Sequence, residues 1–118
     1  MKRNNFETLN DLITVFQQGK QFFKLSKNEY KLNYEEIFIL NYIYQTEDNK
    51  ITAKTIAEYS GLKPYYLTKA LQKLIKMDYL SKTRSDLDER AVVVNVSNEQ
   101  RKRIEQTIES LQMQLQKM

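Results

Sequence analysis

Residues 61–76 read GLKPYYLTKALQKLIK, and this stretch decides the predicted fold. Gly61 suits the left-handed position that follows a helix, and Pro64 suits the first turn of the next helix, where its missing N–H costs nothing. The apolar residues that follow recur at i, i+3, i+4 and i+7, and they are Leu67, Ala70, Leu71 and Leu74. The stretch therefore predicts a tight turn followed by an amphipathic helix over residues 64–77.

The opposite side of this predicted helix is polar and basic. The residues of this side are Tyr65, Thr68, Lys69, Gln72, Lys73 and Lys76. Lys63 and Tyr66 flank them in the sequence. Such a helix fits the major groove of duplex DNA, where lysines neutralise phosphates and Thr68 and Gln72 can hydrogen-bond base edges. Tyr65 and Tyr66 can contact phosphates or thymine methyl groups, and Tyr66 can equally pack at the edge of the core. A solvated lysine-rich surface is the alternative interpretation of this face.

The period of the sequence changes from 3.6 to 2 after this helix. Residues 80–84 alternate weakly, residues 91–96 form a β-branched run, and a charged loop joins the two. We therefore expect a β-hairpin, here called the wing, over residues 80–96.

The tip of the wing is flanked by Arg84 and Arg90, and Lys82 precedes it. A guanidinium fits a narrow, negative minor groove and pairs with phosphates better than an ammonium does, so both arginines are candidate DNA contacts. Asp88 and Glu89 precede Arg90 in the sequence. The Asp88 carboxylate can pair with an arginine and orient its guanidinium. An ordinary charged hairpin turn is the alternative interpretation of this tip.

Two more helices are predicted upstream. Asn33 and Glu36 form a capping-box pattern before a long apolar stretch, so this helix is expected to be central. Ile51 is an isolated apolar residue that is expected to be extended, and Thr52 can cap a short third helix that ends at Gly61. The order helix, extended residue, helix, tight turn, helix and hairpin is that of a winged helix-turn-helix, in a mainly α chain with a small β-hairpin (α+β).

An amphipathic helix is predicted on each side of residues 32–96, which form this core. The first helix covers about residues 6–25, and its apolar stripe includes Phe6, Leu9, Ile13 and Phe16. The last helix begins at a capping box of Ser97 and Gln100, and its apolar stripe is Ile104, Ile108, Leu111 and Leu115.

These two apolar stripes need a partner. A core of this size is not expected to cover both of them within one chain, so the sequence predicts a homodimer of single-domain chains, with residues 1–31 and 97–118 at the interface. A two-fold dimer would place two reading helices about one turn of DNA apart or somewhat more. A monomer whose last helix packs on its own core is the alternative.

The composition removes most catalytic chemistry. The 118 residues include no histidine and no cysteine, which excludes the commonest general base, thiolate metal sites and disulfides. With only two glycines there is no Gly-rich phosphate loop, and we expect no metal and no cofactor. The chain is therefore expected to be a binding protein rather than an enzyme. No apolar run reaches the length of a membrane span, so a cytoplasmic location without a membrane partner is expected.

The net charge of +4 is concentrated in one segment. Residues 63–84 carry six lysines and arginines against one aspartate, whereas residues 1–62 are balanced and residues 85–118 have a net charge of −1. A basic segment on an otherwise balanced chain is what a phosphate-binding face requires. The surplus charge thus coincides with the predicted reading helix and the first strand of the wing.

Three stretches also carry a resemblance to a known family. They are LNYEEI at residues 32–37, KPYYLTKALQKL at residues 63–74 and DER at residues 88–90. With them, the core resembles that of the MarR superfamily and, within it, the staphylococcal accessory regulator (SarA) family. The two flanking helices match this family in position and character.

The resemblance implies a dimeric, DNA-binding transcriptional regulator of virulence genes that acts on A+T-rich promoters. It also implies that four wing residues serve DNA binding and wing geometry, and these are Arg84, Asp88, Glu89 and Arg90. Some members of the family sense oxidation through a single cysteine, and this chain lacks it.

Together these features predict a transcriptional regulator whose reading helix enters the major groove while residues 84–90 meet the minor groove and phosphates. The predicted DNA contacts are Lys63, Tyr65, Tyr66, Thr68, Lys69, Gln72, Lys73, Lys82, Arg84, Asp88, Glu89 and Arg90. One alternative is an architectural protein that bends DNA with little base readout. Another is a protein-interaction module that pairs with a different regulator. The sequence leaves open whether a small molecule binds as well.

Overall fold

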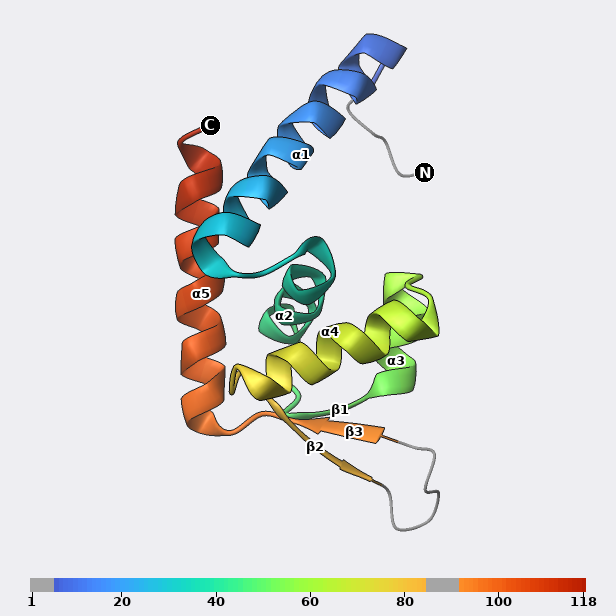
Figure 1. The fold of residues 1–118 in the computed structure, drawn as a ribbon, viewed down its shortest axis with the longest axis vertical. Helices are drawn as coiled ribbons and strands as arrows, with labels where there is room; N and C mark the ends of the chain where they lie inside the picture. The colour runs from blue at the N-terminus through green and yellow to red at the C-terminus, as the bar shows by residue number, and fades with distance from the viewer. Residues whose placement is uncertain (1–5, 85–91) are drawn as a thin grey trace. The chain divides into compact units, whose positions relative to one another are not determined.

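A computed structural model describes residues 6–84 and 92–118 (Figure 1). The chain divides into two compact units, one ending at Asn33 and the other running Tyr34–Met118. Its elements are helices and one small antiparallel sheet. The predicted class, a mainly α chain with a winged helix-turn-helix core, is confirmed by this element order.

The first unit contains one long helix, α1 (Leu9–Tyr30). It begins at a capping box, in which Thr8 Oγ1 accepts the N–H of Asp11 and the Asp11 carboxylate accepts the N–H of Thr8. The helix continues past the predicted end near residue 25. At its C-terminal end Ser26 is buried, and its hydroxyl lies 2.9 Å from the carbonyl oxygen of Leu32, which fastens the chain as it leaves the helix.

The second unit is organised around α2 (Tyr34–Gln45), which packs against the three other helices of that unit. Ile39, Leu40 and Ile43 of α2 are fully buried, as expected of a central helix. The helices around it are α3 (Ala53–Ser60), α4 (Pro64–Lys76) and α5 (Asn98–Gln116). The predicted reading helix is α4, with its boundaries as expected within one residue.

The starts of α3, α4 and α5, and the end of α3, follow the signals in the sequence. Thr52 Oγ1 accepts a backbone N–H in the first turn of α3, and Gly61 follows α3 with φ 68°. Pro64 occupies the first turn of α4. Ser97 and Gln100 form the predicted capping box of α5. These contacts fix where the reading helix begins and where the wing ends.

The wing belongs to a three-stranded antiparallel sheet with the order β1-β3-β2. Its strands are β1 (Lys50–Thr52), β2 (Ser81–Arg84) and β3 (Val92–Asn95). Ile51 is extended, as expected, and it also belongs to a strand, because it is buried in β1 opposite Val94 of β3. A strand of three residues is too short to show an alternating pattern. The extra strand ties the wing to the helical core.

The last helix, α5, packs against α2. Ile104, Ile108 and Leu111 are buried, at 0%, 3% and 3% exposure, whereas Leu115 is 54% exposed. Three of the four residues predicted for a dimer interface on this helix are therefore covered within the chain, which corrects their assignment, whereas Leu9, Ile13 and Phe16 of the first apolar stripe remain exposed. The physical reason is that α2 is apolar around much of its circumference and therefore offers a face to α5 as well as to α4.

Candidate nucleic-acid interface

The outward side of α4 is the first part of the candidate site. Its apolar stripe faces inward, and its residues Leu67, Ala70, Leu71 and Leu74 are buried. The exposed residues, including the one before the helix, are Lys63, Tyr65, Tyr66, Thr68, Lys69, Gln72 and Lys76. The amphipathic division predicted from the sequence is therefore observed, and it leaves cations, phenols and hydrogen-bonding side chains on one face.

The N-terminal turn of α4 combines aromatic rings with a positive charge. The rings of Tyr65 and Tyr66 are 5.5 Å apart and nearly perpendicular, and the Lys69 ammonium lies 5.5 Å from the centre of the Tyr65 ring. Tyr66 is 52% exposed, so of its two predicted positions it takes the surface one. The side chain of Lys63, at the N-cap of α4, makes no capping hydrogen bond, and the positive end of the helix dipole lies at this turn.

Lys73 occupies a different environment from the other lysines of α4. Its Nζ atom lies 3.0 Å from Oε1 of Glu36 on α2. The Glu36 side chain is 6% exposed and that of Lys73 is 36% exposed. Lys73 was predicted from the sequence to contact DNA, and the structure gives it an ion pair that joins the reading helix to the central helix.

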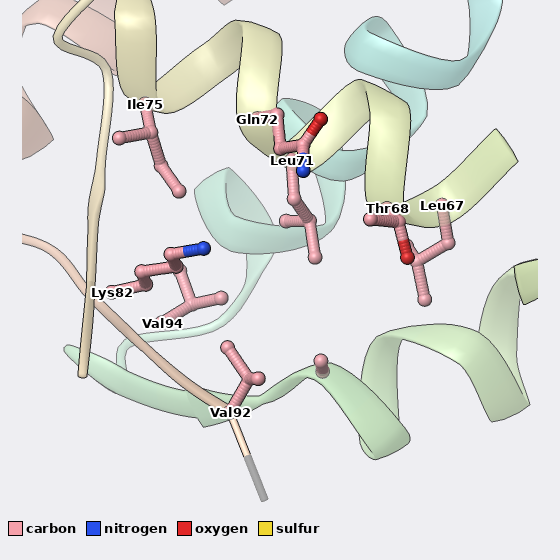
Figure 2. Close-up of a pocket in the computed structure, with 9 residues that line it drawn as sticks. Leu67, Thr68, Leu71, Gln72, Ile75, Lys82, Val92 and Val94 are labelled. Atoms are coloured by element: carbon pink, nitrogen blue, oxygen red, sulfur yellow. The ribbon is translucent and has the colours of Figure 1, made fainter. Parts of the chain in front are cut away.

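Lys82 lies on β2, on the side of the sheet that faces α4. It is opposite Val94 in the strand register, and both residues line a cavity of about 90 Å³ between the sheet and α4. Figure 2 shows that Thr68 and Gln72 of α4 line the same cavity from the other side. The reading helix and the wing therefore meet at this cavity, and their polar side chains stand at its edge.

The tip of the wing lies outside the described residues. This applies to the predicted DNA contacts Asp88, Glu89 and Arg90, and to the side chain of Arg84. The backbone of Arg84 is the last residue of β2 and pairs with Val92 of β3.

A pair of tyrosines beside the reading helix was not assigned to the site from the sequence. Tyr59 of α3 is 69% exposed, and its ring lies 5.3 Å from that of Tyr42 on α2. Desolvation, together with the charges of Tyr59 and Asp48, raises the pKa of Tyr42 above its usual value. A phenol is already neutral at physiological pH, so the raised pKa only widens the pH range over which Tyr42 stays uncharged. The sequence signal is weak, because Tyr59 is spaced like a core residue, three positions after the buried Ile56.

Within residues 6–84 and 92–118, no group of three or more acidic side chains could hold a metal ion. None of the helices in these residues combines the length and apolarity that crossing a bilayer requires.

The match to a family model decides the family. Residues 21–107 match the family described as "Transcriptional regulator SarA/Rot". The chain belongs to the SarA/Rot family. It is 50% identical over 104 residues to the HTH-type transcriptional regulator SarR of Staphylococcus aureus strain USA300, which covers 88% of this chain and 90% of that protein. The SarR of strain COL matches equally well.

Solved structures place the SarA/Rot-family chain in the wider MarR-type fold. Overoxidized AbfR bound to DNA aligns with a TM-score of 0.71 at 18% identity, over 87% of this chain and 74% of that one. BldR from Sulfolobus solfataricus aligns at 0.73 and 20% identity, over 93% and 78%. MarR aligns at 0.72 and 13% identity, over 93% and 79%. The SarA/Rot-family chain is thus a winged-helix transcriptional regulator, and its named relatives are regulators rather than enzymes.

Proposed function

We propose that this regulator binds promoter DNA as a homodimer, with α4 in the major groove and the wing against the neighbouring minor groove and phosphates. The observation that carries the proposal is the outward face of α4, where Thr68, Lys69 and Gln72 are exposed together. A major groove about 12 Å wide admits a single helix with this arrangement of side chains. AbfR, which shares the fold, has been seen bound to DNA.

The side chains of this face suit two different kinds of contact. Lys63, Lys69 and Lys76 are exposed cations that can neutralise phosphates and so position the protein. Gln72 can form paired hydrogen bonds with an adenine edge, and the Thr68 methyl group can pack against a thymine methyl. These preferences support a site rich in A and T.

The wing supplies the second half of the proposed contact. Arg84 ends β2, and Arg90 comes two positions before β3 in the sequence. The minor groove of A-tracts is narrow and strongly negative, and arginine is the side chain that it attracts most. With Asp88 and Glu89 to orient them, these arginines would favour A+T-rich promoters.

The first helix provides the surface for the proposed homodimer. Its predicted interface residues Leu9, Ile13 and Phe16 are exposed, at 78%, 52% and 64%, and Phe6, which precedes the helix, is 38% exposed. Leu115 near the end of α5 is also exposed. Apolar side chains in such a row are normally covered, and a two-fold dimer of this chain would cover them. We propose that the dimer acts in the cytoplasm on accessory or virulence genes, as membership of the SarA/Rot family suggests.

Binding to matched duplexes tests this function. Fluorescence anisotropy would compare an A+T-rich promoter duplex with a G+C-rich duplex of the same length, each challenged with excess nonspecific DNA. We expect the promoter duplex to resist competition at a stoichiometry of two chains per duplex. Equal displacement from both duplexes would favour the architectural alternative, and no binding to either would contradict the proposal.

A further inference from the structure

The first turns of α5 contact both of the chain turns that lead into the wing sheet. One is the turn between α2 and β1, at residues 46–49, and the other is the turn between α4 and β2, at residues 77–80. The α5 residues that make these contacts are Gln100, Arg101 and Arg103. All of them lie in the same compact unit as the reading helix and the sheet.

Arg101 holds the first of these turns with four hydrogen bonds. Its Nη1 atom donates to the carbonyl oxygens of Ile43, at 2.7 Å, and Thr46, at 2.9 Å. Its Nη2 atom donates to the carbonyl oxygen of Asp48, at 2.8 Å, and to Oδ1 of Asn49, at 2.9 Å. The last carbonyl groups of a helix lack helical partners, so one planar guanidinium both caps α2 and fixes the turn after it.

The turn held by Arg101 leads directly into the sheet. The carbonyl oxygen of Asn49 accepts the N–H of Val96, at 3.0 Å, and the next residue, Lys50, pairs with Asn95. The position of the turn therefore determines where β1 lies against β3. β3 is the central strand and also pairs with β2. The position of the turn therefore constrains the position of the whole wing.

The neighbouring α5 residues hold the second turn. Gln100 Nε2 lies 3.3 Å from both Oδ1 of Asp78 and Oγ of Ser81, at the entry to β2. The Arg103 guanidinium lies 4.1 Å from the centre of the Tyr79 ring. The N-terminal end of α5 thus contacts the turn that precedes β1 and the turn that precedes β2. Arg101 makes four of the hydrogen bonds in these contacts.

We propose that Arg101 is a positioning residue for DNA binding, which sets the wing at the angle to α4 that lets both contact one duplex. This inference rests on the proposed function. A wing whose orientation is already fixed loses less conformational freedom when DNA binds, and the affinity is correspondingly higher. Arg101 itself need not touch DNA, since its guanidinium is occupied by the turn.

The test compares Arg101→Gln with Lys102→Gln, which removes the same charge from the adjacent, exposed position. We expect Arg101→Gln to weaken duplex binding about tenfold, the equivalent of losing one good contact, and Lys102→Gln to change it less than about twofold. Arg101→Lys keeps the positive charge but lacks the planar guanidinium that donates all four hydrogen bonds. Its duplex affinity should therefore resemble that of Arg101→Gln. Circular dichroism would establish that each variant is folded at the assay temperature.

A double-variant cycle separates positioning from general destabilisation. If Arg101 acts through the wing, Arg101→Gln should add less than about twofold in a background that carries both Arg84→Ala and Arg90→Ala, because both proposed arginine contacts of the wing are then absent. In a Gln72→Ala background, Arg101→Gln should still weaken duplex binding about tenfold, because Gln72 contacts DNA from α4 and not from the wing. If Arg101→Gln does not fold, Asn49→Ala removes one of the four acceptors and should show the same pattern with an effect of about twofold to threefold.

The outcomes distinguish this inference from the proposed function. If Arg101→Gln lowers the affinity of the Arg84→Ala, Arg90→Ala variant by the same factor as that of the unaltered protein, the positioning role is overturned while DNA binding stays in place. An Arg101→Gln effect equal to that of Lys102→Gln would do the same. Failure of the unaltered protein to bind any duplex would overturn both.

Discussion

Lys73 Nζ lies 3.0 Å from Glu36 Oε1, and this ion pair links the reading helix to the central helix. The carboxylate is almost fully buried and the ammonium is partly exposed. A buried carboxylate is tolerated only when it is paired, so the pair restrains the rotation of α4 about its own axis. That rotation decides which side chains of α4 face outward.

Removing one partner of this pair should destabilise the protein. Lys73→Met leaves the Glu36 carboxylate buried without its ammonium, and we expect a loss of about 1–3 kcal/mol in the free energy of unfolding, reduced by the partial exposure of Lys73. The double variant Glu36→Gln with Lys73→Met should recover part of that loss. Urea denaturation measures both, with Lys76→Met as the control on the exposed side of α4. Equal losses for Lys73→Met and Lys76→Met would show that the pair does not stabilise the fold.

Gln72→Ala should alter site preference more than total affinity. Gln72 is exposed on α4 and can pair with an adenine edge, so its loss should reduce discrimination at one base pair by about 1–3 kcal/mol. Selection of binding sites from a randomised duplex library would show which position relaxes. An unchanged site preference would remove Gln72 from the base-reading set.

Arg84→Ala and Arg90→Ala should weaken binding without changing the melting temperature by more than about 2 °C, because the proposed contacts are to DNA and not to the core. The loss should be larger for an A+T-rich duplex than for a G+C-rich duplex of equal length. Anisotropy titrations with the two duplexes provide the comparison. A loss of the same size on both would argue against insertion into the minor groove.

Phe16→Glu should disrupt the proposed homodimer. Phe16 is 64% exposed on α1, and a carboxylate at this position would have to lose its water to enter an apolar interface. Light scattering after size exclusion should give twice the mass of the chain for the unaltered protein and the mass of one chain for the variant. Gln18→Glu on the same helix is the matched control and should remain dimeric. A monomeric unaltered protein at micromolar concentration would contradict the dimer.

The sequence predicted the reading helix because its signals are local. Gly61, Pro64 and the apolar stripe from Leu67 act within a few residues of one another, and the structure has each of them in the predicted role. The capping box of Ser97 and Gln100 was predicted for the same reason.

The features that the sequence did not reveal depend on contacts between distant residues. Ile51 becomes a strand residue only because Val94 lies opposite it. Ile104 is buried in the folded chain, although its spacing is equally typical of a helix that pairs with another chain. Lys73 follows the spacing of the basic face, and only its distance to Glu36 shows that it is paired within the protein.

The salt dependence of duplex binding tests the central claim most directly. Phosphate contacts release counterions, so a dimer that uses several lysines of α4 should lose on the order of 10³-fold in affinity between 50 and 200 mM salt. Lys69→Gln should make the log–log slope shallower by about one for each contact removed, whereas Lys27→Gln on α1 should leave it unchanged. An affinity that stays flat across this range, or a slope that Lys69→Gln does not change, would contradict binding of DNA through the exposed face of α4.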